Sequence, residues 1–315
     1  MKLGFIYEHP TWSNGLIEAF SQRDIELELI NVADLSFSTD IECFKNFDLA
    51  INRVNIMPSA NRRPQVVFQT LHFLSWLELS GVRIINGSRA HFIGASKAMQ
   101  NGIFSKLGLH HPEAIAIYRP EDALSAAEKI GYPVIIKPNI GGSGSGVSQF
   151  VSEEELRIAI QNKSIDLGVD RTGLVQQFIQ SDGFVYRVEM LGGQLFYTIR
   201  QAIQEESFNY CAADGCSMEN SGDTSKQSEF DFCATDGESR IQAFQPEKDV
   251  INDIKRILKE SEADAGGVEY LMHVDRNLPC FYDINPYSNF VTDSESLLGF
   301  SAESRFVDYV LSQIN

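Results

Sequence analysis

The sequence predicts a protein of mixed α/β and α+β class, and three observations carry this expectation. The chain opens with alternating strand and helix patterns, and a buried-strand pattern in its middle leads into a glycine-rich loop. Its last third begins with the pattern of an antiparallel hairpin. The 315 residues suffice for two or three domains, which we expect at 1–95, 96–182 and 183–315.

The first region is expected to form a small open α/β layer. It begins with a β-α-β pattern, and a later apolar run leads directly into Arg53 and Asn55. Because α/β layers present ligand contacts where strands end, we nominate Arg53 and Asn55 as contacts for an acidic substrate. Strands are expected at 2–7, 25–30, 47–52 and 82–85, and helices at 16–22 and 65–79.

The middle region is expected to alternate helices with strands. Pro120 would lie in the first turn of a helix that ends before Gly131. Ser152 and Glu155 have the Ser-x-x-Glu spacing of a capping box, which predicts the start of another helix. Helices are expected at 96–106, 119–130 and 152–161, and strands at 134–136 and 174–179.

A lysine followed by a glycine-rich loop is the strongest functional signal. Lys137 ends a β-branched run, and backbone N–H groups of the loop can surround phosphate oxygens because glycine has no Cβ. The lysine precedes the glycines, unlike in a Walker A loop, and the Gly-x-Gly-x-x-Gly fingerprint is absent. A flexible linker is disfavoured because the loop follows a buried strand directly. The candidate loop residues are Gly141, Gly142, Ser143, Gly144, Ser145 and Gly146.

The last region is expected to start as an antiparallel hairpin whose turn is Gly192-Gly193. A long polar stretch follows the hairpin and is predicted to be a loop that is mobile or closes over a substrate. Strands are expected at 185–191, 195–200, 268–274 and 279–284, the polar loop at 205–242 and a helix at 249–260.

Three oxygen-bearing side chains in the final strands are candidate metal ligands. Asp283 and Asn285 are alternate residues of one strand and share a face, and Glu269 lies on the strand before it. Mg²⁺ prefers such hard oxygen donors and fills its other positions with water or phosphate oxygens. Taken alone, this pattern is more typical of a solvated strand end with an Asn-Pro turn. Combined with the glycine loop, it favours a metal site.

Composition excludes several functional classes. The formal net charge is −17, with 43 acidic against 26 basic residues, which argues against nucleic-acid and membrane-surface partners. No apolar run approaches a membrane span, and the first residues do not resemble a signal peptide, so we expect a cytoplasmic protein. The five cysteines fit reduced thiols. Cys211 and Cys216 have a spacing that could hold a metal or form a redox pair, although buried or incidental thiols are the favoured interpretation.

Several motifs together resemble the ATP-grasp superfamily, and within it the chain is most similar to the RimK-like (ribosomal protein S6 glutamate ligase-like) carboxylate–amine ligases. The resemblance implies an N-terminal preATP-grasp domain of Rossmann-like type. It further implies a two-subdomain ATP-grasp fold like the ATP-binding domain of glutathione synthetase. The matching motifs are Ser96-Lys97, Val-Ile-Ile-Lys-Pro at 134–138, Val-Gln-Gln-Phe-Ile at 175–179, Tyr-Arg-Val at 186–188 and Asp-Ile-Asn-Pro at 283–286.

The resemblance also implies roles for individual residues. Lys97 and Lys137 would contact the ATP phosphates beneath a flap formed by the glycine loop. Arg200 would lie near the transferred phosphate with Arg187 on the neighbouring strand, although surface salt bridges are the alternative for both. Val185 replaces the acid of the family's Asp-x-Arg motif. The implied adenine hinge is Gln176, Gln177, Phe178 and Ile179, and the implied metal ligands are Glu269, Asp283 and Asn285.

The implied activity is ATP-dependent ligation of a carboxylate to an amine, with ADP formed through an acylphosphate. The substrates would be small molecules or peptides, and the cofactors would be ATP and Mg²⁺ or Mn²⁺, with two ions expected. Homodimers or tetramers are typical of similar enzymes, so the resemblance allows a homo-oligomer but leaves the oligomeric state open. Two rival functions stay open at this point: an ATP-grasp kinase that phosphorylates a hydroxyl, and a non-catalytic ATP-binding regulatory module.

Overall fold

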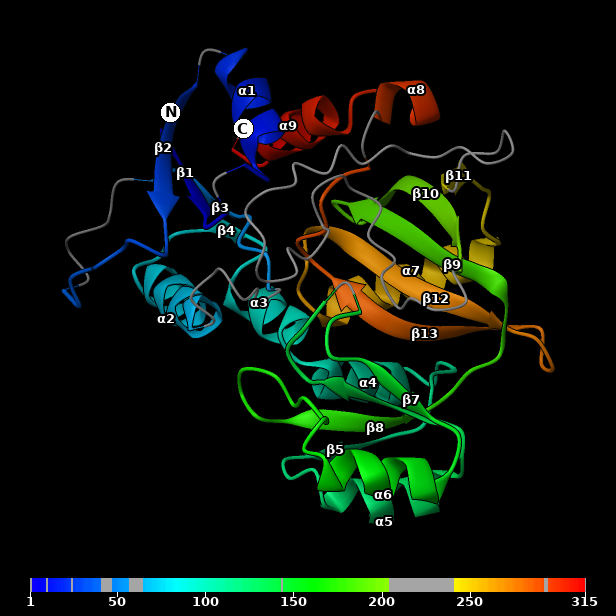
Figure 1. The fold of residues 1–315 in the computed structure, drawn as a ribbon. Coiled ribbons are helices and arrows are strands. Elements are labelled where there is room, and N and C mark those ends of the chain that lie inside the picture. Colours follow the sequence, from blue (N-terminus) through cyan, green and yellow to red (C-terminus); the bar gives the residue numbers. More distant parts are fainter. Residues whose placement is uncertain are drawn as a thin grey trace, which may run out of the picture.

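Three sheets build the chain in the computed structural model (Figure 1). This confirms the expected mixture of α/β and α+β layers. Residues 204–240 lie outside the described part of the structure, and they include most of the expected polar loop with Cys211 and Cys216. The described residues are 2–9, 11–23, 25–40, 47–56, 65–142, 144–203, 241–291 and 294–314.

The first sheet is parallel, with strand order β2-β1-β3-β4. Alternate residues of its strands pack on opposite faces. One face packs against α1 and α9, and the other packs against α2. The elements are β1 (Lys2–Tyr7), α1 (Asn14–Ser21), β2 (Glu26–Asn31), β3 (Leu49–Asn52), α2 (Val66–Leu79), β4 (Ile84–Ile85) and α3 (Ser88–Gly94).

The C-terminal helix α9 (Ala302–Ser312) crosses back to this first sheet, where it lies beside α1 (Figure 1). No helix was expected here. Its buried Phe306, Val307 and Val310 join the same apolar cluster as Phe5 and Phe20. The two ends of the chain therefore pack in one apolar core, which holds the N-terminal layer against the last part of the chain.

The second sheet is antiparallel, with order β5-β8-β6-β7, and α5 and α6 contribute to its apolar core. The Ser152 hydroxyl accepts a hydrogen bond from the Glu155 N–H, which confirms the predicted cap. The expectation for Pro120 was wrong, because α5 begins after it, at Asp122. The elements are α4 (Lys97–Lys106), β5 (Ala114–Ile117), α5 (Asp122–Ile130), β6 (Val134–Pro138), β7 (Ser148–Phe150), α6 (Glu153–Gln161) and β8 (Gly173–Gln177).

The third sheet is antiparallel, with order β11-β10-β9-β12-β13. One face packs on α4 and α7 in a large apolar cluster. Gly192 and Gly193 have φ of 57° and 72°, as the predicted two-residue hairpin turn requires. The elements are β9 (Ser181–Leu191), β10 (Gln194–Ala202), β11 (Ile241–Ala243), α7 (Lys248–Glu260), β12 (Ala265–His273), β13 (Leu278–Asn285) and α8 (Ser294–Leu298). Among the described residues, no helix is long and apolar enough to cross a membrane.

Asn86 joins the first layer to the third sheet through several buried hydrogen bonds. Its Nδ2 donates to the carbonyls of Ala265 (2.9 Å) and Pro286 (2.7 Å). Its Oδ1 accepts from the N–H groups of Asp264 (2.8 Å) and Ala265 (3.1 Å). Asn86 also has φ of 55°, a conformation that asparagine tolerates better than most residues.

Replacing Asn86 with Ala should lower the free energy of unfolding by about 4 kcal/mol, because several buried polar groups lose their partners at once. Urea denaturation followed by circular dichroism measures this change. The exposed Asn162, which ends α6, provides the matched control, and Asn162→Ala should change stability by less than about 1 kcal/mol. Equal urea midpoints for Asn86→Ala and Asn162→Ala would show that the Asn86 contacts do not hold the first layer and the third sheet together.

Candidate active site

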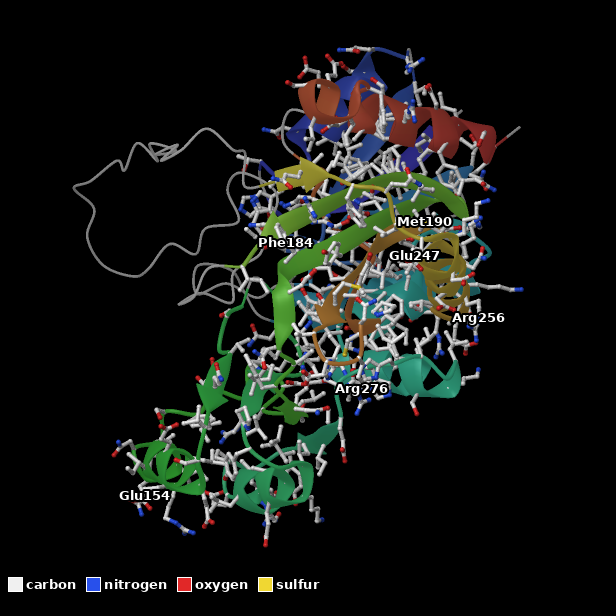
Figure 2. All side chains as sticks on the ribbon, turned by 90° about the vertical axis from the view of Figure 1, so that its right-hand side faces the viewer. Glu154, Phe184, Met190, Glu247, Arg256 and Arg276 are labelled. Carbon is white, nitrogen blue, oxygen red and sulfur yellow. The ribbon has the colours of Figure 1, made fainter. Side chains whose placement is uncertain are left out.

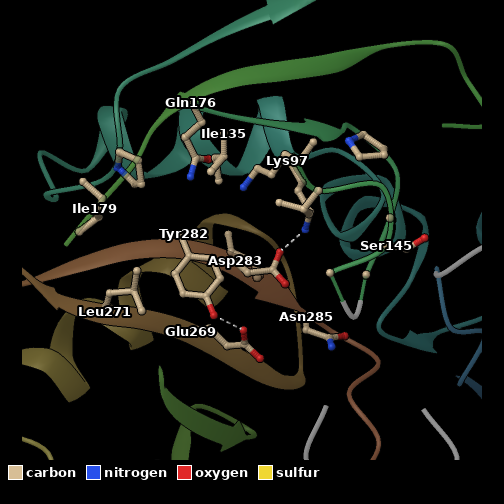
Figure 3. Close-up of a pocket in the computed structure, with 18 of the residues that line it drawn as sticks. Lys97, Ile135, Ser145, Gln176, Ile179, Glu269, Leu271, Tyr282, Asp283 and Asn285 are labelled. Atoms are coloured by element: carbon tan, nitrogen blue, oxygen red, sulfur yellow. Dashed lines mark hydrogen bonds and ion pairs between the residues drawn. The ribbon is translucent and has the colours of Figure 1, made fainter. Parts of the chain in front are cut away.

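A cavity of about 870 Å³ lies between the second and third sheets (Figure 3). Strands β6 and β8 and the glycine loop form one wall, and β12 and β13 form the other. Most of the residues nominated from the sequence line this cavity together. They are Asn55, Lys97, Lys137, Gly141, Gly142, Gly144, Ser145, Gln176, Gln177, Phe178, Ile179, Arg187, Glu269, Asp283 and Asn285.

Arg53, Gly146 and Arg200 are not among the lining residues, and Ser143 lies outside the described residues. The guanidinium of Arg200 lies 4.6 Å from the Phe184 ring centre, and its Nε donates to Gln242. The Arg53 guanidinium donates to the Ser288 carbonyl at 2.9 Å. The roles nominated for these residues stay predictions.

Two lysines converge at one end of the cavity. Lys137 stands near the end of β6 and is only 5% exposed, while Lys97 is the first residue of α4. The Lys97 Nζ donates to the Asp283 Oδ1 at 2.6 Å. Burial and then the charge of Lys97 lower the pKa of Lys137 to about 7, although Asp283 opposes the shift. An anion bound here would favour the charged form of Lys137.

The glycine loop closes this end of the cavity, and its backbone requires glycine at particular positions. Gly144 and Gly146 have φ of 71° and 70°, a region that other residues rarely adopt. A Cβ on Gly146 would lie 2.8 Å from the Pro138 Cγ. The loop therefore runs close over the end of β6, beside Lys137.

The opposite end of the cavity has an apolar wall with one buried amide. The Gln176 side chain is 4% exposed, and its Oε1 has no hydrogen-bond partner among the described residues. The role of this segment as the adenine hinge stays a prediction. The N–H groups of Gln177 and Phe178 already donate to Glu113 and Pro133. The buried side-chain oxygen of Gln176 is therefore one polar group that β8 can offer to a ligand.

The acidic residues face the cavity from the third sheet. Glu269 and Asp283 are direct partners across β12 and β13, and Asn285 follows on the same strand. Burial and then the charge of Asp283 raise the pKa of Glu269 to about 6. A cation between the two carboxylates would offset both effects, so the residues fit a divalent ion. The described residues contain no metal-binding group of three or more His, Cys, Asp or Glu side chains, so phosphate and water would have to complete the coordination.

Arg187 forms a buried ion pair rather than a surface salt bridge. Its Nε donates to the Glu189 Oε1 at 2.6 Å, and the two side chains are 8% and 1% exposed. Burial alone would lower the pKa of Arg187, but the Glu189 carboxylate raises it well above its ordinary value, which keeps the guanidinium charged. Glu189 was missed by the sequence analysis, although Arg and Glu at alternate positions of one predicted strand share a face.

Comparison with known protein families bears on the fold and on the ATP-binding region. Residues 97–181 match the family model of the carbamoyl-phosphate synthase L chain, ATP-binding domain. The glutamate–LysW ligase ArgX of Sulfurisphaera tokodaii is 27% identical over 182 residues, which cover 57% of this chain and 60% of that ligase. The D-alanine–D-alanine ligase of Bacillus pumilus is 29% identical over 171 residues, which cover 49% of this chain and 46% of that ligase. The chain therefore spans less than two thirds of the length of these two relatives.

A solved structure resembles the whole chain. The RimK domain ATP-grasp protein from Sphaerobacter thermophilus has a TM-score of 0.67 and 18% sequence identity. The match covers 99% of this chain and 100% of that protein. At this identity the likeness concerns the fold, and it confirms the expected ATP-grasp architecture.

Proposed function

Because the chain has an ATP-grasp fold and resembles ligases of that superfamily, we propose that it is an ADP-forming carboxylate–amine ligase. The observation that carries the proposal is the cavity. It places two lysines and a glycine loop opposite two carboxylates and an amide, which is an arrangement suited to a nucleotide triphosphate with its metal. The proposed substrates are a carboxylate and an amine, each a small molecule or part of a peptide.

In the proposed complex, Lys97, Lys137 and the loop amides bind the phosphates, and Phe178, Ile179 and the Gln176 amide surround the base. Glu269, Asp283 and Asn285 would hold Mg²⁺ or Mn²⁺, which would neutralise charge on the transferring phosphoryl group. We also propose that two such ions bind. Arg187 borders the same cavity and would add positive charge near the reacting phosphate. Arg200 is proposed to serve the same purpose after nucleotide binding, and Arg53 and Asn55 to contact an acidic substrate.

The proposed reaction needs positioning and charge stabilisation more than a protein nucleophile. A substrate carboxylate oxygen forms a bond to the γ-phosphorus, and the bond to the ADP oxygen breaks. The amine nitrogen then attacks the acyl carbon, the C–O bond to phosphate breaks, and the amine gives up a proton. Lys137 and the loop amides would stabilise the negative charge that develops in the first step. The loop would also exclude water, which would otherwise hydrolyse the acylphosphate.

A product assay tests the proposed function. The protein is supplied with ATP, Mg²⁺ and pooled amino acids or short peptides, and ADP, free phosphate and new masses are measured. Substrate-dependent release of ADP and phosphate with an amide product supports ligation. A phosphorylated product would instead establish a kinase, and ATP binding without turnover would indicate a regulatory module.

Nucleotide binding should take up about one proton per site at pH 8, because Lys137 has a pKa of about 7 and the phosphates should restore its charge. Calorimetric titration of the protein with ATP in buffers of different ionisation enthalpy measures this uptake. Lys137→Met is the control and should show little dependence on the buffer. The same observed enthalpy in all buffers for the wild-type protein would contradict the placement of Lys137 beside the phosphates.

A further inference from the structure

Tyr282 faces the cavity because of an irregularity in strand pairing. Glu269 pairs with Asp283, but the next pair is Tyr270 with Phe281, so Tyr282 is an extra residue in β13. Such a β-bulge redirects side chains, and bulges are frequent beside active sites. As a result, Tyr282 and its neighbour Asp283 both line the cavity, while Phe281 packs in the apolar core on the other face.

The hydroxyl of Tyr282 reaches a proposed metal ligand. It donates a hydrogen bond to the Glu269 Oε2 at 2.6 Å. Figure 3 shows this contact below the Asp283 carboxylate, with both carboxylates on the same side of the cavity. One oxygen of Glu269 is thereby held by the protein, and the other is left for a cation.

The ring of Tyr282 faces the apolar end of the cavity. In Figure 3 it lies between Leu271 and Asp283, and it faces the wall that carries Ile135 and Gln176. A planar base or a ribose bound against that wall would meet the ring from the other side. Tyr282 therefore touches both the apolar end and the acidic end of the cavity.

We propose that Tyr282 is a positioning residue that couples the nucleotide to the metal. This inference rests on the proposed function, because it takes the cavity to hold ATP and a divalent ion. The ring supports the nucleotide, and the phenol fixes the Glu269 carboxylate in the orientation that the ion needs. A bound nucleotide that holds the Tyr282 ring in place would therefore also hold the Glu269 carboxylate, a proposed metal ligand, in place.

Two variants separate the ring from the hydroxyl. Tyr282→Phe keeps the ring, and its affinity for Mn²⁺, measured by electron paramagnetic resonance with ATP present, should fall about 10- to 100-fold. Its affinity for ATP without metal should stay within about twofold of wild type, because the ring contact is kept. Tyr282→Leu should weaken binding of both ATP and Mn²⁺. Tyr270→Phe is the matched control, because Tyr270 lies on the core face of β12 and should leave both affinities unchanged.

The results distinguish the inference from the function on which it rests. Wild-type Mn²⁺ affinity in Tyr282→Phe would overturn the proposed coupling. If Tyr282→Phe and Tyr282→Leu lost the same affinity for ATP in the absence of metal, the proposed coupling would also be overturned. The hydroxyl would then be needed for the cavity as a whole and not only for the metal ligand. Failure of the wild-type protein to bind Mn²⁺ and ATP would instead contradict the proposed function.

Discussion

Replacing Lys137 with Met should reduce ATP-dependent turnover by about 10³-fold, because the cavity loses a charge placed beside the transferring phosphate. Met keeps most of the side-chain volume, so the packing around β6 should survive. The fold should not be weakened, since burial already disfavours the charged form of Lys137 and lowers its pKa to about 7. Steady-state ADP release and thermal unfolding measure the two effects separately.

An exposed lysine provides the comparison. Lys129 lies in the last turn of α5, away from the cavity lining, and Lys129→Met should retain wild-type turnover. Turnover near the wild-type rate in Lys137→Met would remove Lys137 from the proposed site.

Replacing Asp283 with Asn should also reduce turnover by about 10³-fold, because a proposed metal ligand loses its charge and the partner of Lys97 is lost as well. Asn has nearly the same shape as Asp, so the change tests charge rather than packing. Raising the Mg²⁺ concentration should recover little activity. Initial rates over a Mg²⁺ titration check this expectation.

The control for Asp283 is a carboxylate in an exposed pair. Asp253 forms an ion pair with Arg256 within α7, and such surface pairs contribute little to stability. Asp253→Asn should therefore leave the Mg²⁺ dependence unchanged. If Asp283→Asn reached the wild-type rate at saturating Mg²⁺, Asp283 would not be an essential ligand.

Where the signal is local, the sequence predicted which residues come together in one cavity. Lys137 and the glycines after it, and Asp283 with Asn285, are fixed by short runs within single strands and turns, and the structure brings both runs to one cavity. The cap at Ser152 is equally local, since its spacing to Glu155 specifies the hydrogen bond. These features depend on neighbours in the chain rather than on the fold.

The parts that could not be predicted depend on contacts between distant segments. The packing of α9 on the first sheet follows from a cluster that joins Phe306 to Phe5, residues from opposite ends of the chain. The ion pair between Lys97 and Asp283 is of the same kind. Tyr282 was missed because strict alternation places it on the core side, and only the bulge against β12 turns it to the cavity.

Trapping of the acylphosphate tests the proposed ligase mechanism. Hydroxylamine is supplied in place of the amine, together with ATP, Mg²⁺ and pooled carboxylic acids, and the products are identified by mass. We expect the wild-type protein to form a hydroxamate in equal amounts with ADP and free phosphate, and Lys137→Met to form no product. A phosphate ester, or AMP with pyrophosphate, and no hydroxamate would contradict ligation through an acylphosphate.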